Sequence, residues 1–364
     1  MQYANTWPLS ESGYELEAPI GYGSFGTVYA AAALEGPNAG EKVAIKVIEL
    51  ENYPDSNIEE IRKEIQIMRL SSHQNVLSYH VCFLSGRQLW MVMPLLEGGS
   101  VGNLLKHRYQ EGIKDQVLLA SILREVLEGI YYFHQNNQIH RDIKAGNILV
   151  SRSGQILLGD FGVAAKLRQG MSARTFAGSP CWMAPEVVES GGNVAYTNKV
   201  DIWSFGITAI ELAKGRPPYA GHPAMKVMLM IISNDPPSLD EDEEFDASFK
   251  EMINLCLQKE PELRPTAESL LRKKFFNKAK GVEYIRTHMC ADLPRLETLV
   301  KLPKDRKVDR DQSLGNMSSG SGGWDFSLST GENPLSGKKQ NDDPLEQIGS
   351  DEEDPLDSLL EEEN

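Results

Sequence analysis

Polar residues suited to catalysis lie close together at Asp142, Lys144 and Asn147, and another carboxylate, Asp160, follows after two short apolar runs. Phosphoryl transfer needs this combination, because a hydroxyl must be aimed at a phosphate while the charge of that phosphate is neutralised. Asp142 can orient the hydroxyl and accept its proton, and Lys144 can stabilise negative charge in the transition state. Asn147 and Asp160 can supply oxygen ligands to Mg²⁺. The four residues therefore predict a phosphate-transferring site.

The complete strings around these residues are more specific than the residue types, which also occur by chance in exposed loops. Residues 140–147 read His-Arg-Asp-Ile-Lys-Ala-Gly-Asn, and residues 160–162 read Asp-Phe-Gly. Both strings resemble the signature motifs of eukaryotic protein kinases. The resemblance implies an α+β fold of two lobes, with a five-stranded antiparallel sheet and one regulatory helix in the N-lobe and a mainly helical C-lobe. It also implies ATP and Mg²⁺ as cofactors.

A glycine-rich turn joins two predicted strands within residues 14–29. Gly21, Gly23 and Gly26 lack the Cβ atoms that would keep backbone N–H groups away from phosphates. Such spacing also occurs in plain hairpins, so the assignment depends on the kinase resemblance, which places Val28 over the adenine ring. The residues that the resemblance assigns to nucleotide binding are Ile20, Gly21, Gly23, Gly26, Val28, Ala44, Lys46, Met93, Pro94, Leu96 and Leu149.

Lys46 lies within an apolar strand, where a buried ammonium group is costly unless it is paired. The resemblance implies two partners, the α and β phosphates of ATP and a glutamate on the next helix. The apolar spacing predicts that helix over 57–70. Glu64 is the favoured partner, and Glu59 and Glu60 are alternatives that are expected to face water.

The remaining pattern predicts the lobes and their connection. Strands are expected at 43–48, 76–83 and 88–93, and helices at 101–109, at 117–135 and from 201 to 278. By resemblance, Met93 is the gatekeeper, and the hinge uses only the carbonyl of Pro94, which has no N–H group. The expected organisation is a leader at 1–13, a kinase domain at 14–277 (N-lobe 14–93, hinge 94–97, C-lobe 98–277) and a largely disordered acidic tail at 278–364.

Residues 163–183 lack a regular apolar pattern and contain several hydroxyl side chains, as expected of an activation segment. Arg141 offers a cation to a phosphate that would order this segment. Thr175 is the favoured site of that phosphate, Ser172 is a weaker candidate, and a solvated loop is the alternative. By resemblance, the Ser179 hydroxyl bridges the catalytic aspartate and lysine.

The resemblance assigns structural roles to three further residues, with Glu186 paired to Arg264 and Asp201 capping the backbone of the catalytic loop. Lys144 and the string Gly-Ser-Pro-Cys-Trp-Met at 178–183 are similar to those of serine/threonine kinases. The strings that resemble the sterile-20 group occupy residues 95–101, 122–129 and 234–239.

Within that group, the likeness is strongest to the oxidative-stress-responsive and proline/alanine-rich kinases, called Fray, and it extends weakly to Gly-Gly-Trp-Asp-Phe at 322–326. This resemblance implies protein substrates with Ser or Thr, among them cation-chloride cotransporters, and an upstream with-no-lysine kinase that acts on Thr175. Fray kinases also carry a C-terminal docking domain for Arg-Phe-containing peptides. The sequence after Trp324 predicts no such domain, which argues against the same substrates and activator.

Composition limits the partners. A net charge of −15 makes nucleic acid and anionic membranes poor partners and favours basic peptides or proteins. No apolar run approaches the roughly 20 residues that span a bilayer, and the N-terminus resembles neither a signal peptide nor a myristoylation site. Cys82, Cys181, Cys256 and Cys290 lack metal-ligand spacing and are expected to be reduced thiols. The expected compartment is the cytoplasm, and a visit to the nucleus stays open.

Charged residues, Ser, Gly and Pro dominate the tail from 301 onward, which predicts disorder. After Lys339 it has eleven carboxylate side chains and no Lys or Arg. A solvating tail is the default interpretation, but Asn-Pro-Leu at 333–335 and Asp-Pro-Leu at 343–345 and 354–356 could bind partners or act as a pseudosubstrate. For the whole chain, the alternative to an active kinase is a kinase-like scaffold that activates a partner without transferring phosphate.

Overall fold

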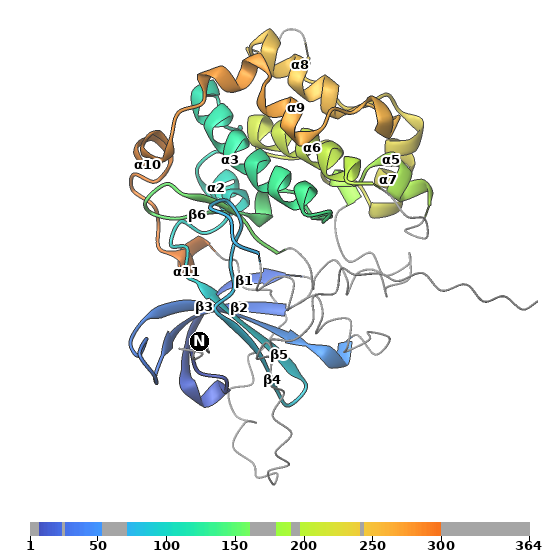
Figure 1. Ribbon diagram of the computed structural model, residues 1–364. Coiled ribbons are helices and arrows are strands. Elements are labelled where there is room, and N and C mark those ends of the chain that lie inside the picture. The colour runs from blue at the N-terminus through green and yellow to red at the C-terminus, as the bar shows by residue number, and fades with distance from the viewer. Residues whose placement is uncertain are drawn as a thin grey trace, which may run out of the picture. The chain divides into compact units, whose positions relative to one another are not determined.

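The apolar runs of the N-terminal part pair into one antiparallel sheet in the computed structural model, with strand order β1-β2-β3-β5-β4 (Figure 1). The structure describes residues 7–23, 26–52, 71–160, 180–190, 197–240 and 244–299, all of which belong to one compact unit. The strands are β1 (Tyr14–Gly23), β2 (Gly26–Ala33), β3 (Lys42–Glu49), β4 (Val81–Ser85) and β5 (Gln88–Pro94).

β3 is the middle strand and is buried on both faces from Val43 to Ile48. Successive side chains of a strand point to opposite faces. Val43 and Ile45 join a cluster with Trp90, whereas Ile48 joins the main core. Burial on both faces explains why this strand is a continuous apolar run, with Lys46 as its only charged interior residue.

Helices form most of the remaining part. They are α2 (Val101–His107), α3 (Gln116–Gln135), α5 (Pro185–Glu189), α6 (Lys199–Lys214), α7 (Ala224–Ser233), α8 (Ala247–Cys256), α9 (Ala267–Leu271), α10 (Val282–Met289) and α11 (Leu296–Leu299). A small hairpin, β6 (Ile148–Val150) and β7 (Ile156–Leu158), lies between the sheet and the helices (Figure 1). Short 3₁₀ turns occur at Glu11–Gly13, Leu50–Asn52, Ala145–Asn147, Pro180–Trp182, Pro261–Leu263 and Lys274–Lys278.

The ends of the two longest helices have local causes. Asp115 caps α3, because its carboxylate accepts hydrogen bonds from the N–H groups of Val117 and Leu118. Gly215 ends α6 in the left-handed conformation that favours glycine. α6 is buried from Val200 to Ala213 and packs against α3 and α8.

The strand predicted at 76–83 was too long, since β4 begins only at Val81. The preceding residues pair with the hairpin instead: the N–H of Leu77 donates to the carbonyl of Leu158 at 2.8 Å, and the N–H of Leu158 donates to the carbonyl of Asn75 at 2.8 Å. Val76 forms an isolated parallel bridge with Leu158. Burial of Val76 and Leu77 therefore reflects contact with β7, whereas the N–H of His80 already donates to the carbonyl of Val92 in β5 at 2.9 Å.

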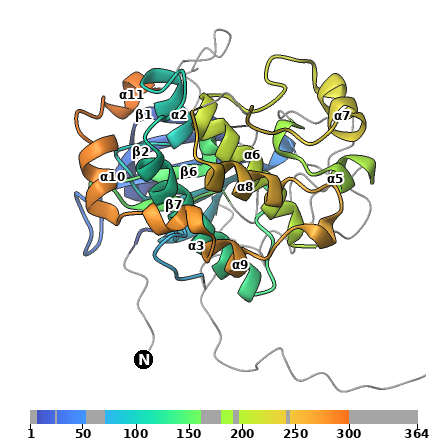
Figure 2. The ribbon, with the colours of Figure 1, turned by 90° about the horizontal axis from the view of Figure 1, so that it is seen from above.

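The folded region also extends past the predicted boundary at 277. α10 packs on α3, and α11 contacts α2 and β1 (Figure 2). Arg108 donates to the carbonyls of Met289 and Ala291, and the side chains of Leu296 and Leu299 are buried. These two helices were not predicted from the sequence, because they are very short and their few apolar residues are spread among charged ones.

Several predicted segments lie outside the described residues. They are the helix at 57–70, most of the activation segment and the tail from 300 onward. Within the described ranges, no helix combines the length and apolar character needed to cross a membrane.

Candidate active site

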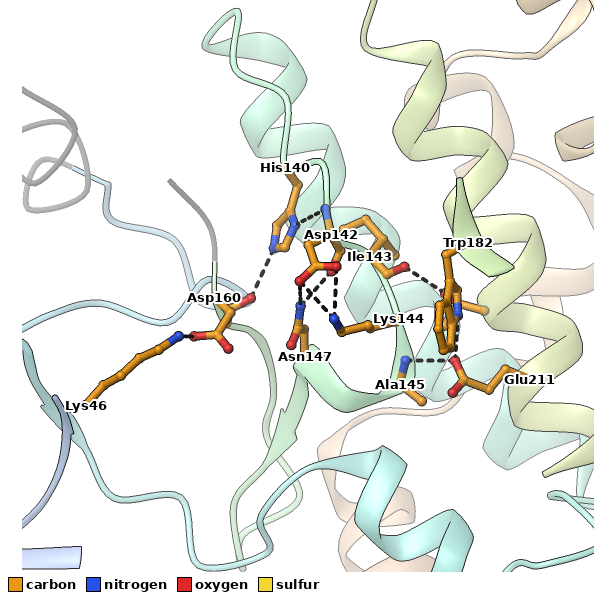
Figure 3. A network of polar contacts seen from close by, with 12 residues as sticks. Lys46, His140, Asp142, Ile143, Lys144, Ala145, Asn147, Asp160, Trp182 and Glu211 are labelled. Atoms are coloured by element: carbon orange, nitrogen blue, oxygen red, sulfur yellow. Dashed lines mark hydrogen bonds and ion pairs between the residues drawn. The ribbon is translucent and has the colours of Figure 1, made fainter. Parts of the chain in front are cut away.

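The catalytic loop brings the three residues predicted for it into contact. Lys144 Nζ lies 3.0 Å from both carboxylate oxygens of Asp142. Asn147 Nδ2 donates to the main-chain carbonyl of Asp142 at 2.7 Å and to its Oδ2 at 2.8 Å. Figure 3 shows the Asp142 carboxylate held between the other two side chains. The carboxylate is thus oriented from both sides, as a group that must aim a hydroxyl requires.

Asp201 of α6 holds the start of the loop. Its carboxylate accepts the N–H of His140 at 2.9 Å and that of Arg141 at 2.8 Å. Arg141 has a φ of 68°, a backbone conformation that costs on the order of 1 kcal/mol for such a residue and must be stabilised by its surroundings. Asp201 therefore occupies the capping position that the kinase resemblance assigns to it.

A second contact fixes Asp201 itself. His134 of α3 lies 2.9 Å from its Oδ2. Burial by itself would raise the pKa of Asp201, but the hydrogen bonds from His134 and Arg141 and the neighbouring imidazoles bring that pKa below its ordinary value. Burial lowers the pKa of His140, which favours its neutral form. Asp201 is therefore held as a carboxylate in the interior.

Four buried polar residues follow one another on α6, at Asp201, Ser204, Thr208 and Glu211. Their steps of three, four and three residues place them on one face of the helix. We call this set the α6 polar stripe. It lies in a helix whose other buried residues are nearly all apolar.

The stripe contacts the loop and the segment at 180–182. Ser204 Oγ donates to the carbonyl of Trp182 at 2.8 Å, and Thr208 Oγ1 donates to the carbonyl of Ile143 at 3.3 Å. Glu211 accepts from both segments (Figure 3). Of the four residues, only Asp201 was predicted from the sequence; the regular spacing of the other three within an apolar stretch was the signal that could have revealed them.

Lys46 forms an ion pair with Asp160, which connects the sheet to the segment after β7 (Figure 3). Lys46 is 4% exposed, so this partner compensates a buried charge. The predicted partner Glu64 lies outside the described residues, as do Thr175, Ser172 and Ser179.

The residues assigned to nucleotide binding come from both lobes. In the sheet, Val28 is opposite Lys46, Ala44 is opposite Met93, and Pro94 ends β5. A Cβ on Gly26 would lie 2.0 Å from the carbonyl oxygen of Val47, so this position requires glycine. The remaining assigned apolar residues, which are partly buried against the main core, are Ile20, Leu96 and Leu149, while Gly21 and Gly23 lie in β1.

The donor groups of Asn147 and Asp160 fit a small hard cation. Both amide hydrogens of Asn147 are engaged by Asp142, which leaves the amide oxygen as the group that can coordinate. Asp160 adds a carboxylate that is partly exposed. Two oxygen donors together with phosphate oxygens are a usual ligand set for Mg²⁺.

Glu186 and Arg264 form a bidentate pair, with Nη1 to Oε1 at 2.6 Å and Nη2 to Oε2 at 2.8 Å. Arg264 is fully buried, and its Nε donates to the carbonyl of Gln258 at 2.7 Å. The pair joins α5 to the turn at 261–263.

Comparison with known proteins identifies relatives of this chain. The protein kinase domain family matches residues 14–276. The chain is 47% identical over 294 residues to serine/threonine-protein kinase fray2 of Dictyostelium discoideum, covering 80% of this chain and 28% of the relative. It is 45% identical over 304 residues to germinal center kinase 3 of Caenorhabditis elegans, covering 78% and 50%. Identity to serine/threonine-protein kinase fray1 of Dictyostelium discoideum is 40% over 296 residues, covering 80% and 50%. The chain therefore spans half or less of the length of these relatives.

Proposed function

The chain belongs to the protein kinase family and, within it, to the sterile-20 group of serine/threonine kinases, and from this we propose that it transfers the γ-phosphate of ATP to hydroxyls of proteins. The observation that carries the proposal is the Asp142 carboxylate held between Lys144 and Asn147. A scaffold that transfers no phosphate has no need for this arrangement.

Each loop residue has a defined part in the proposed reaction. Asp142 orients the substrate hydroxyl and accepts its proton as the bond to phosphorus forms. Lys144 places its ammonium group beside the transferred phosphate and stabilises the charge of the transition state. Asn147 and Asp160 would hold Mg²⁺, which when bound neutralises phosphate charge. Lys46 would bind the phosphates of ATP and keep them in line with the hydroxyl.

Regulation through the activation segment forms part of the proposal. Phosphate on Thr175 would pair with Arg141, which immediately precedes the catalytic aspartate. An upstream kinase would supply that phosphate. The similarity to proteins named fray supports a role in stress or ion-homeostasis signalling, and the cytoplasm is the proposed compartment.

The test is transfer of radiolabelled phosphate from ATP and Mg²⁺ to a generic serine/threonine substrate by the wild type, Asp160→Ala and Thr175→Ala. We expect activity in the wild type, none above background in Asp160→Ala and weak activity in Thr175→Ala. A wild type that carries phosphate on Thr175 and is as inert as Asp160→Ala would favour the scaffold.

A further inference from the structure

The short helix α11 lies at the boundary between the sheet and the helical lobe (Figure 1). It contacts β1 on one side and α2 on the other. The side chains of Leu296 and Leu299 are buried and belong to the main core. A helix of four residues has little stability of its own, so these contacts hold it in place. α11 therefore links the two lobes at a place that is remote in sequence from the hinge.

The two leucines of α11 contact the segment that follows the hinge. Gly99 has a φ of 69°, which favours glycine. A Cβ added to Gly99 would lie 2.9 Å from Cδ2 of Leu296 and 3.7 Å from Cδ1 of Leu299. The lack of a side chain at this position thus allows the leucines to pack directly on the backbone that leaves the hinge.

The same backbone is bonded to β6 on its other side. The N–H of Val150 donates to the carbonyl of Gly99 at 2.9 Å, and the N–H of Gly98 donates to the carbonyl of Val150 at 3.0 Å. β6 carries Leu149, which is one of the residues assigned to nucleotide binding. The contacts therefore run from α11 through Gly99 to the strand that holds Leu149 opposite the hinge.

The end of α2 fixes the segment that leads to α11. The side chains of residues 107–109 all contact main-chain carbonyls within 288–299. Arg108 Nη1 donates to the carbonyl of Ala291 at 2.8 Å, and His107 Nε2 lies 3.2 Å from the carbonyl oxygen of Leu299. The other two carbonyls held in this way are those of His288 and Met289. The position of α11 is therefore determined by polar contacts as well as by burial.

We propose that Leu296 and Leu299 are positioning residues for the nucleotide: by packing on Gly99 they keep the hinge and Leu149 at the separation that fits an adenine ring. This inference rests on the proposed kinase function. It goes beyond that function because both leucines lie outside the set of residues assigned to nucleotide binding. α11 then sets the affinity for the nucleotide and leaves that for the peptide unchanged.

Binding of a fluorescent ATP analogue with Mg²⁺ to the full chain, together with steady-state kinetics, tests the proposal. Leu296→Ala is expected to raise the Kd for the analogue and the KM for ATP about 10-fold, because the space left beside Gly99 allows the hinge to move. KM for the peptide should stay within about twofold. Leu296→Met, which nearly conserves the side-chain volume, should restore both nucleotide parameters to within about threefold of wild type.

His107→Ala tests the same contact without altering the core, since His107 is exposed. It removes the polar contact with the carbonyl of Leu299. The Kd for the analogue should rise about threefold, as expected for the loss of one hydrogen bond, while the melting temperature should change little.

Ile285→Ala is the matched control. Ile285 is fully buried on α10, which packs on α3, so the substitution creates a cavity in the same C-terminal region. It should lower the melting temperature at least as much as Leu296→Ala and leave the Kd for the analogue unchanged. If Ile285→Ala weakens nucleotide binding as Leu296→Ala does, or if either Leu296→Ala or His107→Ala binds the analogue as tightly as wild type, the positioning role is refuted while the kinase function stands. A wild type that binds no nucleotide and transfers no phosphate would instead refute the proposed function.

Discussion

Lys46 and Asp160 are 114 residues apart in the chain and form an ion pair between β3 and the end of the β6–β7 hairpin. The Lys46 side chain is 6% exposed and that of Asp160 is 41% exposed. A buried ammonium group needs a counter-charge, and in this structure the counter-charge is the carboxylate predicted to bind Mg²⁺. The lysine and the aspartate that were predicted to bind phosphate and metal are therefore in direct contact.

Asp160→Ala should abolish phosphate transfer while leaving the fold intact. Activity should fall at least about 100-fold, because charge neutralisation at the phosphates is lost. The melting temperature should also fall, because the buried ammonium group of Lys46 loses its counter-charge, at a cost of about 3 kcal/mol. Glu17→Ala is the control: it removes the exposed partner of Lys42, which lies on β3 as Lys46 does. It should change neither activity nor stability measurably. Retained activity in Asp160→Ala would contradict the assigned metal site.

Arg264→Lys should destabilise the chain by about 3 kcal/mol, because a lysine cannot reproduce the bidentate pair with Glu186 and leaves buried acceptors unsatisfied. Urea unfolding followed by tryptophan fluorescence measures the loss. Arg272→Lys is the control, since Arg272 pairs with Glu268 on an exposed helix face. Equal unfolding free energies for the two variants would show that burial of the Glu186–Arg264 pair does not matter.

The residue pattern predicts an element correctly where only one structure satisfies it. β3 was predicted from an apolar run, and its burial on both faces follows from its central place in the sheet. Residues 76–77 were assigned to the wrong strand because burial against β7 gives the same pattern as burial within a sheet. α10 and α11 were missed because tertiary contacts, such as those of Arg108 with two main-chain carbonyls, stabilise helices too short to be detected by periodicity.

The site itself was predictable only in part. Asp142, Lys144 and Asn147 lie within one loop, so their local spacing already determines that they meet. Glu211 reaches the same loop from a distant helix, and only the packing of α6 shows which backbone group it binds. Contacts between residues this far apart in the chain can be predicted only when the fold is known as well as the sequence.

Asp201→Asn should be destabilising at pH 7, by an amount that decreases in acid. Although burial opposes it, hydrogen bonds from His134 and Arg141 and the nearby imidazoles hold the pKa of Asp201 below its ordinary value. A carboxyl group with a lower pKa in the folded state stabilises the fold above its unfolded pKa of about 4, and that contribution is lost as pH falls through the folded pKa. The unfolding free energies of the wild type and of Asp201→Asn should therefore converge as the pH falls from 7 to 3. A constant difference would show that charge is not involved.

Gly26→Ala and Gly21→Ala form a matched pair in the glycine-rich turn. The added Cβ of Gly26→Ala would meet the carbonyl oxygen of Val47 at 2.0 Å, whereas that of Gly21→Ala would meet Val28 at an ordinary 3.5 Å. Gly26→Ala should cost about 2 kcal/mol of stability through displaced backbone, and Gly21→Ala less than about 0.5 kcal/mol. Both should raise KM for ATP if the turn binds phosphates. If KM for ATP rises in Gly26→Ala but not in Gly21→Ala, the cause is distortion of the strand and not the loss of a phosphate contact.

Glu211→Gln should stabilise the chain, increasingly so as pH rises. The folded state keeps Glu211 protonated up to about pH 7, because burial raises its pKa from 4.5. The folded chain thus binds a proton that the unfolded chain has released, so wild-type stability declines as pH rises through this window. Glutamine does not ionise, and its advantage should grow from about 1 kcal/mol at pH 5 to about 3 kcal/mol at pH 8, at about 1.4 kcal/mol per pKa unit. Denaturant unfolding at both pH values measures it, with the exposed Glu268→Gln as control. An advantage that does not depend on pH would mean that Glu211 has the same pKa in the folded and the unfolded chain, whereas the expected increase would show that its charge costs stability in the folded chain.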